Sequence, residues 1–216
     1  MNATVDIVYL TEAPGATNTW PLGRTVHCRP KPADVARCVD ELLTTSRPAA
    51  ILFWDPQLGT PNPELVTELL AQPEQAWHAG LCLGTGGLPR MLDPVVATWM
   101  HNCDPPTGVE ATSWRLSLSA CLIRASVFEV VGNVHPEFNG ITCAGLELGH
   151  RFIRRGVQIR HVPRLLPAKT TSVRVEQIEL EDEIRFIYYR YGPKWVGWAS
   201  ARMVLTGEAN AMRTRL

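Results

Sequence analysis

The 216-residue chain lacks several features that mark particular classes of protein. Its 21 Lys and Arg residues are balanced by 21 Asp and Glu residues, so no net charge points to nucleic acid or another polyanion. No apolar run approaches the roughly 20 residues of a membrane span. The opening MNATVDIVYL has no basic segment ahead of a long apolar one, as a signal peptide would. We therefore expect a cytoplasmic protein with no nucleic-acid partner.

Closely spaced cysteine pairs are also missing. None of the six cysteines forms a C-x-x-C motif, and several lie in apolar runs such as GLCLG and SACLIR. This favours buried free thiols in a reducing compartment, with a zinc site or a disulfide set as the alternative. The glycine-rich GLCLGTGGLP lacks both the Lys-Ser/Thr of a P-loop and a complete G-x-G-x-x-G. We expect a flexible loop there.

What the sequence does contain is an alternation of strand and helix patterns. The expected strands cover residues 4–12, 24–28, 49–55, 77–84, 118–123 and 157–163, and the expected helices cover 32–46, 62–72, 92–102, 126–131 and 145–156. From about residue 175 the chain is helical, with a break at Gly192 and Pro193. This alternation predicts an α/β domain over 1–174, with a mostly parallel central sheet flanked by helices, and a helical extension over 175–216.

One strand pattern raises a functional question. In AAILFWDPQLG, four apolar residues run directly into Asp55 and then a proline. In α/β folds, ligands bind beyond the carboxyl ends of the strands, and Glu12 follows an expected strand in the same way. Asp55 is therefore a candidate ligand-binding carboxylate. The alternative is that it only ends a strand before a proline turn.

A longer block of sequence resembles a known family. LIRASVFEVVGNVHPEFNG and then GLELGHRFIRRGVQIRHVP are similar to the second half of family 2 glycosyltransferases of the GT-A fold, and ILFWDPQL takes the place of the family's Asp-x-Asp strand. The resemblance covers roughly residues 5 to 170, and the matching residues are Arg124, Gly132, Glu137, Phe138, Glu147, Leu148, Gly149, Arg151, Gly156, Val162 and Pro163. It implies a nucleotide-sugar-binding fold and sugar transfer from a nucleotide-sugar donor to an unidentified acceptor.

The chain departs from the family pattern at the metal and base positions. Only Asp55 remains of the metal-binding acids, with Gln57 in the second place, so the resemblance implies Mn²⁺ or Mg²⁺ bound weakly or not at all. The family's Glu-Asp pair aligns with Ala144 and Gly145, which leaves Glu147 as the nearest candidate base. An ordinary i,i+4 ion pair between Glu147 and Arg151 is the alternative.

The resemblance also implies a set of donor-binding residues. These are Thr11, Glu12, Asp55, Gln57, Trp114, Ser117, Ser119, Arg151 and Lys169. Arg151, Lys169 or Arg124 would supply the positive charge that a departing diphosphate needs when no metal does so. Core packing is the competing account of Trp114, and ordinary solvation is that of Lys169.

The end of the chain interleaves aromatic and basic residues. RFIYYRYGPKWVGWASARMVL suits a peripheral membrane contact or a lipid-linked acceptor, and it equally suits packing on the domain or a homodimer contact. The sequence thus predicts a glycosyltransferase with weak or no metal dependence. The alternative is a catalytically inactive binding or partner protein of the same fold.

Overall fold

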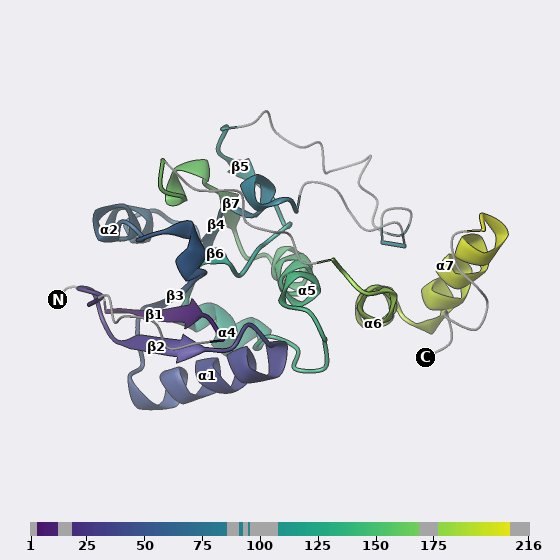
Figure 1. Ribbon diagram of the computed structural model, residues 1–216, viewed down its shortest axis with the longest axis horizontal. Helices are drawn as coiled ribbons and strands as arrows, with labels where there is room; N and C mark the ends of the chain where they lie inside the picture. The colour runs from purple at the N-terminus through teal and green to yellow at the C-terminus, as the bar shows by residue number, and fades with distance from the viewer. Residues whose placement is uncertain are drawn as a thin grey trace.

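The computed structural model describes residues 4–12, 19–85, 91–92, 95, 108–168 and 177–207. They form an α/β fold with a seven-stranded sheet flanked by helices (Figure 1). The strands are β1 Val5–Leu10, β2 Thr25–Cys28, β3 Ala50–Trp54, β4 Ala76–His78, β5 Ala111–Thr112, β6 Ala120–Arg124 and β7 Ile159–His161. The α-helices are α1 Pro32–Thr45, α2 Pro63–Leu70, α4 Ala125–Val131, α5 Ile141–Arg154, α6 Leu180–Tyr191 and α7 Pro193–Leu205. Three short 3₁₀ helices are η1 Pro56–Leu58, η2 Gly80–Leu83 and η3 Pro163–Leu165.

The sheet is mixed, where the sequence predicted a mostly parallel one. Its strand order is β2-β1-β3-β6-β4-β7-β5. The β6 strand runs antiparallel to both β3 and β4, and β5 runs antiparallel to β7. The remaining neighbours are parallel. Residues just before β6 therefore lie at the same edge of the sheet as residues just after β1, β3, β4 and β7.

Alternating side chains on the strands build two separate cores. On β3, Ile51 and Phe53 join one apolar cluster, and Leu52 and Trp54 join the other. The first cluster includes residues of α1, α4 and α5, and the second includes residues of α2, so the helices cover both faces of the sheet (Figure 1). Because β3 is buried on both faces, its sequence is a continuous apolar run.

Most expected elements are present, and two of them are corrected. The α5 helix begins at Ile141, four residues before its expected start, because the Asp182 carboxylate accepts hydrogen bonds from the backbone N–H groups of Asn139 and Gly140. The expected strand 77–84 is only β4, after which the chain turns into η2. The two-residue β5 is too short to leave a pattern. Most of the expected helix 92–102 lies outside the described residues.

Arg124 stands at the opposite edge of the sheet from Asp55. Its guanidinium donates hydrogen bonds of 2.8–2.9 Å to the carbonyls of Leu70, Gln72 and Glu74, which close the C-terminal end of α2. It also lies 5.3 Å from the centre of the Trp77 ring. Arg124 therefore holds α2 against the sheet, and the interpretation of Arg124 as a clamp on a diphosphate near Asp55 is wrong.

The C-terminal helix α6 packs on α5, and α7 packs on α6. The break between them at Gly192 and Pro193 is confirmed, and Gly192 has a φ of 87°, which favours glycine. Phe186 of α6 and Met203 of α7 belong to the apolar cluster that also includes residues of α1, α4 and α5. A boundary at residue 174 stays a prediction. No helix in the described part of the chain is long and apolar enough to cross a membrane.

Candidate functional site

Three neighbouring strands bring polar residues together at the carboxyl edge of the sheet. Tyr9 is paired in register with Trp54, and Trp54 with Ala120. The backbone N–H of Asp55 donates a 2.7 Å hydrogen bond to the carbonyl of Ser119. Thr11 follows β1 at the same edge. We call Thr11, Glu12, Asp55, Gln57 and Ser119 the carboxyl-edge cluster.

The Asp55 carboxylate has one role that the structure shows directly. Its Oδ1 accepts a 2.9 Å hydrogen bond from the backbone N–H of Gln57 and caps η1, so Asp55 does shape the turn after β3. Within the described residues Oδ2 accepts no hydrogen bond. The side chain is half-buried, and this desolvation raises the pKa of Asp55. Asp55 therefore shapes the turn with one carboxylate oxygen and keeps the other available for a ligand.

The other donor-binding candidates differ in their exposure. Glu12 and Gln57 are exposed, and Thr11 and Ser119 are half-buried. Ser117 is buried, and its hydroxyl accepts a 3.3 Å hydrogen bond from the backbone N–H of Ser119. Ser117 therefore orders the segment that carries Ser119.

Trp114 lies in the core. Only 4% of its surface is exposed, and its ring meets those of His150 and Phe186 at centroid distances of 5.4 and 6.3 Å. These contacts favour the packing account of Trp114 over a sugar contact.

Glu147 and Arg151 are buried on α5, where they contact α6 and the segment before α5. The two carboxylate oxygens of Glu147 lie 3.1 Å from Nη2 of Arg151 and 3.0 Å from Nε of Arg190, which belongs to α6. His135 approaches the same carboxylate at 3.9 Å. The predicted i,i+4 ion pair is confirmed. Glu147 lies in the second turn of α5, because the helix begins at Ile141.

The burial of Glu147 and Arg151 argues against their expected roles as base and as donor-binding residue. Glu147 has no exposed surface, so no acceptor hydroxyl reaches it in this conformation. The Arg151 guanidinium donates a 2.6 Å hydrogen bond to the carbonyl of Asn133, and desolvation lowers its pKa. Their assignments as base and as donor-binding residue stay predictions, and the geometry favours a structural role for both. Lys169 lies outside the described residues.

The carboxyl-edge cluster is a poor match for a divalent metal. Hard cations require several oxygen ligands, and Asp55 offers one free carboxylate oxygen. In the part of the chain that the structure describes, no three His, Cys, Asp or Glu side chains are grouped so as to hold a metal ion. These residues do not fit a catalytic metal.

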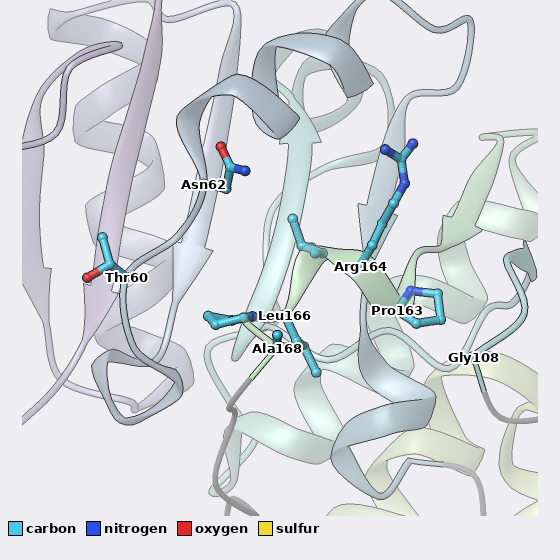
Figure 2. A pocket seen from close by; sticks show the side chains of 9 residues that line it. Thr60, Asn62, Gly108, Pro163, Arg164, Leu166 and Ala168 are labelled. Carbon is cyan, nitrogen blue, oxygen red and sulfur yellow. The ribbon is translucent and has the colours of Figure 1, made fainter.

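A groove of about 740 Å³ lies beside the carboxyl-edge cluster. Figure 2 shows Thr60 and Asn62, which lead into α2, opposite Leu166 and Ala168, which follow η3. The groove adjoins the Asp55 turn, because a Cβ on Gly59 would stand 3.6 Å from the Pro167 ring. No motif in the sequence marks it, since its walls come from segments about 100 residues apart.

The only cation that lines the groove among the described residues is already neutralised. Arg164 forms two hydrogen bonds of 2.8 and 2.9 Å with the Glu68 carboxylate and one of 2.7 Å with Glu110. The groove therefore presents mainly neutral surface, which suits a hydroxyl-rich ligand better than a phosphate.

Two histidines and one cysteine meet at the ends of β4 and β7. The His78 Nδ1 atom accepts a 2.9 Å hydrogen bond from the backbone N–H of Gly80, which places the ring proton on Nε2, 2.9 Å from the carbonyl of Ser113. His161 lies beside the His78 ring, and its Nε2 is 3.7 Å from the Cys82 sulfur. His78 thus shapes the turn into η2.

The cysteine prediction is confirmed in part. Cys28, Cys38 and Cys121 are free and buried, and Cys143 is buried with its thiol donating a 3.5 Å hydrogen bond to the carbonyl of Asp182. Cys82 is free but exposed, since the turn into η2 carries it out of the core. Cys103 lies outside the described residues.

The burial of His78 predicts a loss of stability in acid. Burial lowers the pKa of His78 to about 3, whereas histidine in the unfolded chain titrates near its ordinary value. The unfolded state therefore binds a proton that the folded state does not. Above about pH 6.5 the His78 ring is neutral in both states and does not lower the free energy of unfolding. Below this pH, the free energy of unfolding should fall by up to about 1.4 kcal/mol per pH unit toward pH 3. Urea unfolding from pH 7 to 4 measures this slope, to which His150 adds because burial lowers its pKa to about 4.

A direct measurement separates His78 from other groups. Its ring resonances in an NMR titration should keep the positions of neutral imidazole down to about pH 4. A midpoint near 6.5 for His78 would contradict the buried, neutral ring.

Comparisons of the chain with protein-family models, with curated proteins and with solved structures found no match.

Proposed function

We propose that the chain binds a nucleotide-sugar donor at the carboxyl edge of its sheet and transfers the sugar to an acceptor, as glycosyltransferases of the GT-A fold do. The order of elements supports this proposal. β6 ends at Arg124, α4 is capped by Gly132, α5 carries Leu148 and Gly149, and Val162 follows β7. The family resemblance implies the same order of strand, helix, helix and strand.

One observation carries the assignment. The carboxyl-edge cluster places Asp55, with one free carboxylate oxygen, between Thr11 and Ser119 and beside a largely neutral groove. A nucleotide sugar carries ribose and sugar hydroxyl groups, which a free carboxylate oxygen and a neutral hollow can bind. The cluster and the groove offer these two surfaces next to one another.

Asp55 is also the better-placed carboxylate for the chemistry. Inverting transfer requires a group that takes the proton of the acceptor hydroxyl, and a base works best when its pKa approaches the operating pH. Desolvation moves the pKa of Asp55 in that direction. We therefore prefer Asp55 to the fully buried Glu147 as the base of any transfer.

A non-catalytic binding protein is the second candidate function. It is favoured by the ion-paired, buried state of Glu147. In that case a donor-like ligand binds at the carboxyl-edge cluster and is released unchanged.

Ligand-induced stabilisation tests donor binding. At a ligand concentration of 100 times Kd, binding should add about 2.7 kcal/mol to the free energy of unfolding, visible as a rise in melting temperature with uridine or guanosine nucleotide sugars. Asp55→Asn should reduce this rise, because it weakens contacts to ligand hydroxyls. Glu129→Gln, an exposed change on α4, is the matched control and should leave the rise intact.

The same samples distinguish the two functions. Release of free nucleotide on incubation with an acceptor mixture identifies a transferase. A melting-temperature rise without nucleotide release identifies a binding protein. No rise with any nucleotide or nucleotide sugar would refute both.

A further inference from the structure

We propose that α7 is a docking surface for an anionic lipid bilayer. Its inward face includes Ala199 and Met203, which belong to the core cluster. Its outward face carries two large aromatic side chains, Trp195 and Trp198, which are 44% and 46% exposed. Leu205 extends the same side and is 87% exposed. Such exposure of bulky apolar side chains on one helix marks an interaction surface.

Helical spacing places these residues in one stripe. Trp195, Trp198, Arg202 and Leu205 follow intervals of three, four and three residues, which keep them on one side of a helix. The two indole rings meet at a centroid distance of 5.7 Å, so they form one continuous aromatic surface. Figure 1 shows α7 at the end of the molecule away from the sheet, with α6 between it and α5.

Both charged residues of α7, Lys194 and Arg202, are cations. Lys194 and Arg202 flank the tryptophans, and the sequence from Ile184 to Gly207 contains no Asp or Glu. Among the described residues, neither Lys194 nor Arg202 has an ion-pair partner, whereas Arg190 is bound to Glu147. A surface of this composition complements anionic headgroups, which contribute about 1 kcal/mol per nearby Lys or Arg. Tryptophan prefers the interface between headgroups and acyl chains.

A second copy of the chain fits the same face less well. A 13-residue helix is about 20 Å long and about 10 Å wide, so one face covers on the order of 200 Å², far below the roughly 800 Å² per partner of a stable interface. A symmetric contact through α7 would also bring four cations together without a carboxylate from either helix. A bilayer meets neither obstacle.

Vesicle sedimentation of the full chain tests the proposal. The protein should sediment with vesicles of phosphatidylcholine containing about one-third phosphatidylglycerol, and much less with phosphatidylcholine alone. At about 1 kcal/mol per cation, replacing both Lys194 and Arg202 by Gln should weaken binding roughly 30-fold. Trp195→Ala with Trp198→Ala should abolish sedimentation. The control Arg24→Gln, at an exposed arginine before β2, should bind like the parent.

Other outcomes overturn the proposal. Sedimentation that survives both double variants would show that another surface binds lipid. A dimer in light scattering that the tryptophan variant converts to monomer, without vesicle binding, would assign α7 to a second copy. A monomeric protein that sediments with neither kind of vesicle would also refute the proposal. Circular dichroism of each variant shows whether it is folded.

Discussion

Glu147→Ala should destabilise the protein by about 3–5 kcal/mol, as expected when one partner of a buried ion pair is removed. The Glu147 side chain has no exposed surface and lies between the guanidinium groups of Arg151 and Arg190, at 3.1 and 3.0 Å. Its removal leaves two cations close together with little water to screen them. Urea unfolding monitored by circular dichroism measures the loss.

Two further variants define the cause. Glu129→Ala removes an exposed carboxylate from α4 and should change the free energy of unfolding by less than about 0.5 kcal/mol. Glu147→Met combined with Arg190→Met should be more stable than Glu147→Met alone, because the second change removes a stranded charge. A Glu147→Ala protein within about 1 kcal/mol of the parent would contradict the role of this cluster.

The ion pairs of Glu147 also affect any mutational test of Glu147 as a catalytic base. Glu147→Gln keeps the shape of the side chain but removes the negative charge between two guanidinium groups. Lower turnover in this variant is evidence for a base only if the protein is as fully folded as the parent.

Gly149→Ala should cost about 3 kcal/mol or more, although alanine is the better helix former. Gly149 lies where α5 crosses the segment before β6. A Cβ there would stand 2.1 Å from the carbonyl oxygen of Trp114 and 2.8 Å from Cβ of Leu116, so the helix and this segment would have to move apart. Thermal or urea unfolding measures the effect.

Gly197→Ala is the matched control. Gly197 is also within a helix, α7, but a Cβ there meets no atom within 4 Å. This change should stabilise the protein by about 0.5–1 kcal/mol through helix propensity alone. Equal effects of the two substitutions would show that the close crossing at Gly149 does not limit stability.

Local signals in the sequence predicted those parts of the fold that neighbouring residues determine. The apolar run of β3 and its end at Asp55 come from residues within one strand. Asn62 caps α2 as its place before a proline indicates, and Gly132 ends α4. At these places the chemistry that determines the structure lies within a few positions.

The missed features depend on distant partners. Arg190 binds Glu147 from 43 residues further along the chain, and Asp182 sets the start of α5 from 42 residues beyond Gly140. No periodicity encodes such contacts. The same holds for the groove, whose walls meet only when the ends of β3 and β7 reach one edge of the sheet.

The place of β6 in the sheet has a consequence during synthesis. On the side away from β1, β3 is paired by β6, and residues 50–54 meet residues 120–124 about 70 positions later. At about 5–20 residues per second, a ribosome takes several seconds to deliver the missing strand. During that interval the apolar β3 has an open edge, which can pair with other chains. Nascent chains paused before residue 120 should therefore bind chaperones, and release should follow the emergence of β6.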